Sequence, residues 1–255
     1  GDIQRTRNIL ERATAVHAKR RPECHLWKAR FEERCGNVDA ARKAFDHLLA
    51  EVAPGLLQGI VAYANMERRQ GSLDGACRVF ESSAEREKGS GEGSESSYNY
   101  THIAIHHARF VQQFVRDLDK ARKIYEDAVA FAPTQRVLWE GYILLESNSS
   151  GDDVAKRVLG LFERALDPAV GMQKEDRDLL SLRHIEYMDF FGNAEDLKAL
   201  TCSHVKLGYV NGVTSKKRAR SDVPSSEEGY NHEAKRALTA ANGVPPAAPA
   251  PAFTP

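Results

Sequence analysis

The residues of this sequence that could carry out acid–base chemistry are glutamates spaced to meet basic side chains. Glu32 and Arg42 are spaced to face each other across the two helices of one helical hairpin. Glu146 and Lys156 have the same relation. Exposed pairs of opposite charge at helix crossings mostly orient the helices and contribute about 0 to 1 kcal/mol. We therefore interpret both pairs as structural and predict no catalytic residue.

Histidine and cysteine side chains offer metal binding and nucleophilic attack as further chemistry. His102 and His106 stand four residues apart on an expected helix, which can place two imidazoles on one metal ion. His107 would point elsewhere and no glutamate completes a His-Glu-x-x-His motif, so we predict no metal site. Cys202 is close to His204 but has no activating base, and we expect it to be a small buried side chain. Without a glycine-rich phosphate loop, no cofactor is expected.

The composition favours protein partners over nucleic acid. Of 255 residues, 42% are hydrophobic and 28% are charged, as in a soluble folded protein. Lysine plus arginine (36) equals aspartate plus glutamate (36), so no global positive field draws phosphate. No apolar run approaches the roughly 18 residues needed to cross a bilayer. The chain begins at Gly1 without an initiator methionine or a signal pattern, and we expect an internal start.

A repeat of about 35 residues organises the chain. Residues 31–42 match residues 66–77, with Gly36 and Gly71 in register. A second phrase, a bulky residue followed by Glu or Asp, recurs with the bulky residue at positions 10, 45, 80, 125 and 162. The longest step contains residues 88–97, whose glycine and serine content predicts a mobile loop. Periods of this size are typical of stacked supersecondary units.

Each unit is expected to contain two antiparallel helices. In the second helix, apolar residues fall three or four apart, as in Val38, Ala41 and Phe45, and form one stripe that must be buried. Asn37 and other polar residues at equivalent positions are expected to cap that helix, and Gly192 to end the helix before it in the left-handed conformation, as at Gly36 and Gly71. Large side chains of the first helix should pack on small ones of the second. The predicted repeat-packing residues are Trp27, Phe31, Ala41, Phe45, Tyr63, Ala76, Phe80, Ala121, Tyr125, Trp139, Tyr142 and Phe162.

These features predict an all-α superhelix, a solenoid of antiparallel helix pairs. It should occupy residues 1–212 with about five repeats, because one pair cannot bury its stripe alone. Residues 213–255 have the composition of a disordered tail that ends in proline and alanine. The basic cluster of this tail is a candidate nuclear localisation signal and consists of Lys216, Lys217, Arg218 and Arg220.

The repeat resembles the half-a-tetratricopeptide (HAT) family, whose second helix carries Ala-Arg-x-[Ile/Val]-[Tyr/Phe]-Glu-x-Ala. Residues 121–128 read Ala-Arg-Lys-Ile-Tyr-Glu-Asp-Ala and are nearly complete. Residues 26–37, 66–73 and 183–193 are similar to members that act in pre-mRNA splicing. The resemblance implies a non-enzymatic nuclear scaffold, associated with proteins of the small nuclear ribonucleoprotein (snRNP) that recognises the 5′ splice site. It further implies a homodimer, or a heterodimer with a paralogous HAT protein, with RNA contact indirect or weak.

The C-terminal repeats carry more apolar surface than the end of a solenoid usually exposes. We favour a dimer interface there, although the same residues could simply close the core of the array. Three alternative functions remain open: a HAT scaffold of mRNA 3′-end cleavage or ribosomal RNA maturation, a peptide-binding co-chaperone, and a helical protein that binds RNA directly. The candidate interface residues are Leu182, Ile185, Tyr187, Phe190, Phe191, Leu197 and Leu200.

Overall fold

The computed structural model describes residues 2–89, 94–151 and 153–209 of the chain. Every regular element within these segments is a helix, which confirms the all-α solenoid prediction. The chain divides into two units, Gly1–Asn211 and Gly212–Pro255, and the second lies outside the described residues. None of the described helices combines the length and the apolar character that a membrane span needs.

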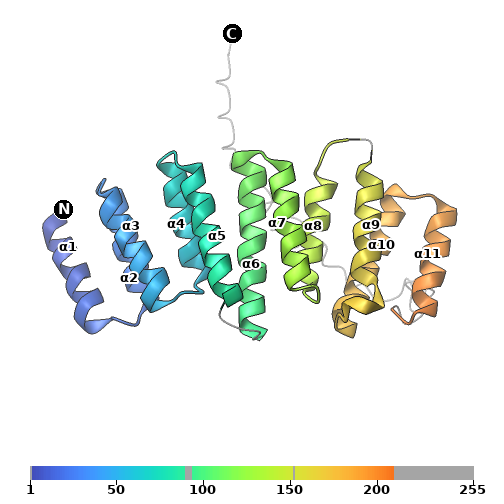
Figure 1. Ribbon diagram of the computed structural model, residues 1–255, viewed down its shortest axis with the longest axis horizontal. Helices are drawn as coiled ribbons and strands as arrows, with labels where there is room; N and C mark the ends of the chain where they lie inside the picture. Colours follow the sequence, from blue (N-terminus) through green and yellow to red (C-terminus); the bar gives the residue numbers. More distant parts are fainter. Residues whose placement is uncertain (1, 90–93, 152, 210–255) are drawn as a thin grey trace, which may run out of the picture. The chain divides into compact units, whose positions relative to one another are not determined.

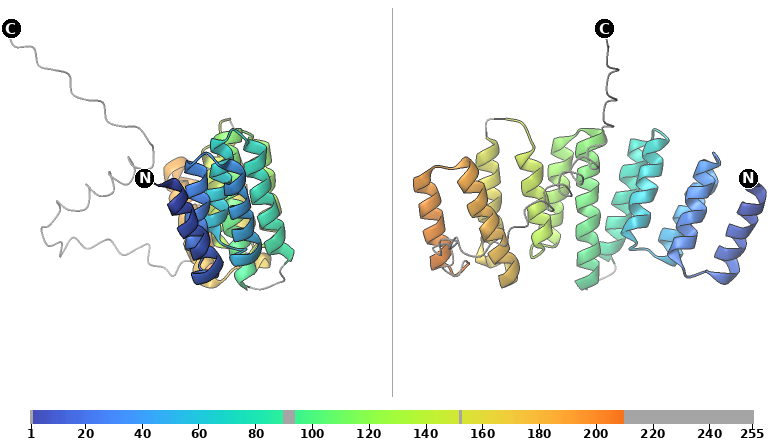
Figure 2. Two further views of the ribbon diagram at one scale, coloured as in Figure 1. Left: turned by 90° about the vertical axis from the view of Figure 1, so that its left-hand side faces the viewer. Right: turned by 180° about the vertical axis from the view of Figure 1, so that it is seen from behind.

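One helix and five antiparallel pairs make up the described part of the first unit, and successive pairs stand side by side (Figures 1 and 2). When the repeats are aligned, α1 corresponds to the second helix of a repeat. In each of the five pairs that follow, the even-numbered helix is the first helix of its repeat. The bounds are α1 Ile3–Arg12, α2 Pro22–Arg34, α3 Val38–His47, α4 Leu57–Arg69, α5 Leu73–Gly89, α6 Ser94–Phe110, α7 Leu118–Phe131, α8 Arg136–Ser147, α9 Val154–Leu166, α10 Lys174–Phe191 and α11 Ala194–Lys206.

Polar side chains cap several second helices. Asp117 accepts a hydrogen bond from Lys120 N (2.9 Å), and Asn193 accepts one from Asp196 N (2.8 Å). These contacts satisfy amide groups that a helix start otherwise leaves unpaired. Asn37 does not cap α3 as predicted, because its Nδ2 donates instead to Glu32 Oε2 (3.0 Å).

Glycines end two of the first helices in the left-handed conformation. Gly36 has φ of +80° and Gly71 has φ of +82°, a region that side chains with a Cβ rarely adopt. Gly192 was expected to do the same, but its φ is −93° and α10 ends in an extended residue. Two of the three predicted stops are therefore of the left-handed kind.

The loop expected over residues 88–97 is shorter than predicted. α5 continues to Gly89 and α6 begins at Ser94, so helix extends into both ends of that segment. Residues 90–93 lie outside the described part of the chain.

The core is a row of stacked rings, each pair of which joins the second helix of one repeat to the first helix of the next. Tyr63 lies on Phe45 with ring centroids 5.0 Å apart, and Tyr142 lies on Tyr125 at 5.2 Å. At the equivalent positions of two other repeats, histidine replaces tyrosine: His107 lies on Phe80 (5.3 Å) and His184 on Phe162 (4.6 Å). Stacked aromatic pairs contribute about 0.5–1.5 kcal/mol beyond their buried area. The row therefore binds each repeat to its neighbour.

Candidate interaction surfaces and the inter-repeat ladder

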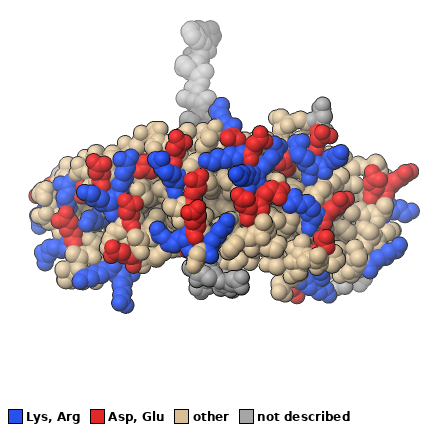
Figure 3. Space-filling view, viewed as in Figure 1, with Lys and Arg blue, Asp and Glu red and all other residues tan. Residues whose placement is uncertain are grey.

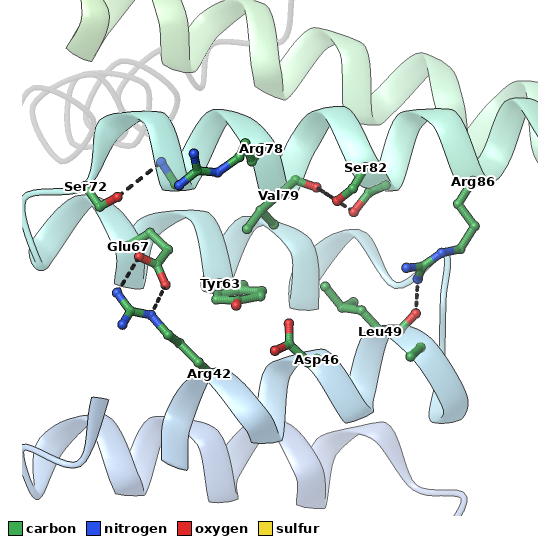
Figure 4. Close-up of a pocket in the computed structure, with 13 residues that line it drawn as sticks. Arg42, Asp46, Leu49, Tyr63, Glu67, Ser72, Arg78, Val79, Ser82 and Arg86 are labelled. Atoms are coloured by element: carbon green, nitrogen blue, oxygen red, sulfur yellow. Dashed lines mark hydrogen bonds and ion pairs between the residues drawn. The ribbon is translucent and has the colours of Figure 1, made fainter. Parts of the chain in front are cut away.

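Arginine–glutamate pairs join successive repeats in the same direction as the ring row. Arg42 of α3 contacts Glu67 of α4 through two bonds, Nε to Oε1 at 2.7 Å and Nη2 to Oε2 at 2.9 Å. Arg7 of α1 contacts Glu32 of α2 in the same way, at 2.8 and 2.9 Å. Figure 4 shows the Arg42 pair with Tyr63 beside it. Two parallel bonds fix both the distance and the orientation of the two groups.

A third pair of this kind lies further along the chain. Arg122 of α7 contacts Glu146 of α8 at 2.6 and 3.1 Å, and Arg157 of α9 adds a bond to Glu146 Oε2 at 2.8 Å. Glu146 is 2% exposed, and burial alone would raise its pKa. The hydrogen bonds from the two arginines outweigh burial and hold the pKa below its ordinary value. We call these three pairs the inter-repeat ladder.

The pairing predicted from the sequence was wrong in its partners. Arg42 does not meet Glu32 within its own repeat, because Glu32 binds Arg7 of the preceding repeat. Likewise Arg122 and Arg157, not Lys156, bind Glu146. Each helix has neighbours on two sides, and the spacing along the sequence does not distinguish them.

The ladder is interrupted where repeat register places Cys77 and Val111. Cys77 of α5 is equivalent to Arg42 of α3, and Val111, the residue after α6, is equivalent to Glu67 of α4. Both side chains are buried. His107 lies here with its Nε2 without a hydrogen-bond partner among the described residues and 4.0 Å from Glu81 Oε1. Burial lowers the pKa of His107 to about 4. Where one repeat has arginine at this position, the next has the matching glutamate. Here both residues are replaced together.

The candidate packing residues do not all lie in the core. Nine are buried, and Phe31 and Tyr63 are half-buried, but Trp27 is 60% exposed. The packing role predicted for Trp27 is therefore corrected. The nine buried residues are Ala41, Phe45, Ala76, Phe80, Ala121, Tyr125, Trp139, Tyr142 and Phe162.

His25 occupies the anchor position that sequence reasoning gave to Trp27. Its Nε2 lies 3.0 Å from Lys19 O, as Trp139 Nε1 donates to Pro133 O at 2.8 Å, and in both cases the carbonyl is six residues earlier. Counting seven residues back from Glu32 and Glu146 reaches His25 and Trp139, so the sequence did contain the signal.

The histidine candidates His102 and His106 lie on α6, and Cys202 lies on α11. His102 and His106 are half-buried, and the part of the chain that the structure describes holds no group of three metal-ligating side chains. Cys202 is exposed, not buried as predicted. His204 is buried and lies 2.6 Å from Ser181 Oγ through its Nδ1.

Comparisons with known proteins found a matching family model and similar sequences. The sequence model of the PRP39 C-terminal HAT repeat matches residues 1–69, the segment that contains the Arg7 and Arg42 pairs. Pre-mRNA-processing factor 39 of Xenopus laevis is 27% identical over 191 residues, which cover 75% of this chain and 28% of the frog protein. The Homo sapiens protein of that name is 28% identical over 196 residues, covering 75% and 27%.

Residues 1–69 of this chain match a HAT-repeat model, and the chain is similar to pre-mRNA-processing factor 39 over 75% of its length. It spans about a quarter of the length of these curated relatives. Among solved structures, BtubC of P. vanneervenii aligns over 100% of this chain and 98% of its own, with 16% identity and a TM-score of 0.42. A score this low does not establish a shared fold.

The candidate interface residues lie on two different surfaces. Tyr187, Phe190 and Phe191 line an apolar groove of about 410 Å³ between α8 and α10, together with Ile143 and Leu144. Phe190 is 80% and Phe191 71% exposed. Leu200, in contrast, lines a separate hollow beside His184. Leu182 is exposed, and Ile185 and Leu197 are half-buried.

The remaining prediction concerns the basic cluster at residues 216–220. Lys216, Lys217, Arg218 and Arg220 lie outside the described residues, so the nuclear localisation signal stays a prediction from the sequence.

Proposed function

We propose that this chain is a non-enzymatic scaffold of pre-mRNA splicing that acts in the nucleus with the snRNP recognising the 5′ splice site. The similarity to pre-mRNA-processing factor 39 over 75% of the chain carries this proposal. The placement of the charged side chains supports it. Glu32, Glu67 and Glu146 are all buried and all engaged by arginine, so the groups best suited to acid–base chemistry hold repeats together.

The scaffold acts through its geometry. The ring row joins each helix pair to the next, and the ladder adds ion pairs at three of the junctions between repeats, so a surface on one repeat is held at a fixed separation from a surface on another. Charged side chains of both signs alternate over the face seen in Figure 3, which suits contacts with several proteins better than one uniform phosphate surface.

Dimerisation through the C-terminal repeats is the second part of the proposal. Phe190 and Phe191 are largely exposed beside the apolar groove between α8 and α10. Exposed aromatic side chains next to an apolar groove are typical of protein interfaces. A twofold pairing would bury both copies of this surface and would double the number of attached components.

Capture from nuclear extract tests the assembly. The tagged full chain should retain the small nuclear RNA that pairs with the 5′ splice site, measured by quantitative reverse transcription, together with proteins of that snRNP. Recovery of 3′-end cleavage or ribosomal RNA maturation factors without this RNA would contradict the proposal.

Sedimentation velocity tests the pairing. The wild-type chain should sediment as a dimer at micromolar concentration, and Phe190→Glu with Phe191→Glu should give a monomer. Val16→Glu, at an N-terminal position that is 65% exposed, is the matched control and should remain dimeric. A wild-type monomer would overturn this part of the proposal.

A further inference from the structure

Four hollows recur at equivalent positions of the solenoid. Each lies between the second helices of two successive repeats, with the intervening first helix between them. The first hollow is lined by α1, α2 and α3, the second by α3, α4 and α5, the third by α7, α8 and α9, and the fourth by α9, α10 and α11. Because the repeats are similar, one extended chain lying along this row would meet the four hollows in turn.

The first two hollows carry unpaired positive charge. The second, of about 610 Å³, is shown in Figure 4. Its Arg42 is engaged by Glu67, and its Arg86 donates a hydrogen bond to Leu49 O. Neither Arg78 nor Arg86 has an ion-pair partner among the described residues, and the one other carboxylate in the lining is that of Asp46. In the first hollow, Arg7 is engaged by Glu32. Two lysines, Lys28 and Lys43, then share the lining with one remaining carboxylate, that of Glu11.

Lys43 in the first hollow and Arg78 in the second occupy equivalent positions of the repeat. They are 35 residues apart, one repeat period, and both are exposed. Neither has an ion-pair partner among the described residues. The third hollow has glycine, Gly160, at the corresponding place, and its three arginines are all engaged by carboxylates. The unpaired positive charge is therefore confined to the N-terminal part of the row.

The fourth hollow has the opposite sign. It is about 370 Å³ and is lined by Glu163 and Asp167, with no lysine or arginine among its lining residues. Glu163 has no ion-pair partner in the described segments, and Asp167 Oδ1 accepts only from Ala169 N (2.9 Å). His184 also lines this hollow, is 4% exposed, and has an Nδ1 atom without a hydrogen-bond partner among the described residues. Burial keeps this ring neutral near pH 7, because its pKa is about 4.

We propose that the row of hollows binds one extended segment of a partner protein whose acidic side chains contact Lys43 and Arg78 and whose basic side chains enter the hollow formed by Glu163 and Asp167. Charge complementarity sets the direction in which the segment lies. A peptide fits this row better than RNA does. The tyrosine rings of the second and third hollows, Tyr63 and Tyr142, already have one face stacked on Phe45 and Tyr125. The acidic fourth hollow would also repel a phosphate backbone. This inference goes further than the scaffold role, since it names the chemistry of a partner.

Three synthetic peptides in a glycine–serine background test the proposal with the full chain. One is rich in glutamate, one is rich in arginine, and one joins both blocks through linkers of graded length. Fluorescence anisotropy at low ionic strength measures the affinities. We expect the joined peptide to bind at least about tenfold more tightly than either single block at the best linker length.

Variants assign each block to its hollow. Lys43→Glu with Arg78→Glu should weaken the glutamate peptide about tenfold and leave the arginine peptide unchanged. Glu163→Gln with Asp167→Asn should do the reverse, and asparagine keeps the acceptor that caps Ala169. The matched controls are Arg34→Glu with Lys198→Glu, and Asp189→Asn with Glu195→Gln, all exposed residues that line none of the four hollows.

Three results would overturn the proposal. The first is that the hollow variants change affinity no more than the control variants. The second is a joined peptide that binds no more tightly than its better half, which would exclude a single segment. The third is displacement of the glutamate peptide by oligouridine at lower concentration than by free glutamate peptide, which would assign the basic hollows to RNA. None of these outcomes depends on recovery of a splicing complex, so the scaffold role succeeds or fails separately.

Discussion

Arg42 and Glu67 are 25 residues apart in the sequence and form a bidentate ion pair that joins one repeat to the next. Arg42 is part-exposed, whereas the Glu67 side chain is buried. Replacing only Arg42 therefore leaves a buried carboxylate without its partner, which costs more than an exposed pair is worth.

We expect Arg42→Leu to destabilise the fold, because it leaves the buried Glu67 carboxylate without its partner. Arg42→Leu with Glu67→Leu should recover at least half of that loss, because no charge remains buried. Urea denaturation of both single variants and the double variant gives the coupling free energy. The exposed pair Arg183 and Glu186 is the control and should show coupling near zero. Additive effects at Arg42 and Glu67 would contradict the ladder.

The interruption of the ladder gives a second test. Val111 is fully buried and register places it opposite Cys77, so Val111→Glu should destabilise the chain by about 3 kcal/mol or more. Adding Cys77→Arg should recover part of this loss if the two positions face each other as Arg42 and Glu67 do. Thermal unfolding followed by circular dichroism is sufficient. A double variant less stable than Val111→Glu alone would show that the positions are not equivalent.

Because the buried histidines are neutral, the folded chain should lose stability as the pH falls. The pKa of His184 is about 4 in the folded chain against an ordinary value of 6.5, because burial disfavours the charged ring. A lowered folded-state pKa contributes stability that is complete above pH 6.5 and is lost as pH falls from 6.5 towards 4. His184→Phe should therefore reduce the loss of stability between pH 7 and pH 5 by about 2 kcal/mol.

Urea denaturation at both pH values measures this difference. His17→Phe, at an exposed position, is the control and should leave the pH dependence unchanged. An unchanged pH dependence in His184→Phe would show that another group carries the effect.

Two glycines inside helices should respond oppositely to alanine. A Cβ at Gly141 would lie 2.8 Å from Tyr125 Oη and 3.2 Å from its ring, and Tyr125 is buried, so Gly141→Ala should cost about 1–3 kcal/mol. A Cβ at Gly160 meets nothing within 4 Å, so Gly160→Ala should stabilise by about 0.5–1 kcal/mol through helix propensity. Melting temperatures of both variants provide the check, and shifts of the same sign would contradict the close approach of α8 to Tyr125.

Replacing the two tryptophans should also change stability by unequal amounts. Trp27 is 60% exposed, so its fluorescence should be quenched by acrylamide and Trp27→Ala should cost less than about 0.5 kcal/mol. Trp139 is 2% exposed and its indole donates to Pro133 O, so Trp139→Ala should cost about 3–5 kcal/mol. Equal costs would contradict the exposed position of Trp27.

The sequence by itself determined the helices, their pairing into repeats and the similarity to HAT-repeat proteins. These depend on features within a short stretch of chain, such as the stripe of Val38, Ala41 and Phe45 and the period that relates Gly36 to Gly71. Such spacing defines which side chains share one face of a helix.

Only the tertiary structure decided which neighbour that face meets. Each helix in a solenoid packs on two sides, so the sequence was consistent with Arg42 binding Glu32 as well as Glu67, and the packing selected Glu67. The same reason explains why Trp27 points outward while His25 takes the anchor position, and why unpaired charge changes sign between Lys43 and Glu163 along one row of hollows. Burial and charge compensation depend on the neighbouring repeat, and stacking supplies that neighbour.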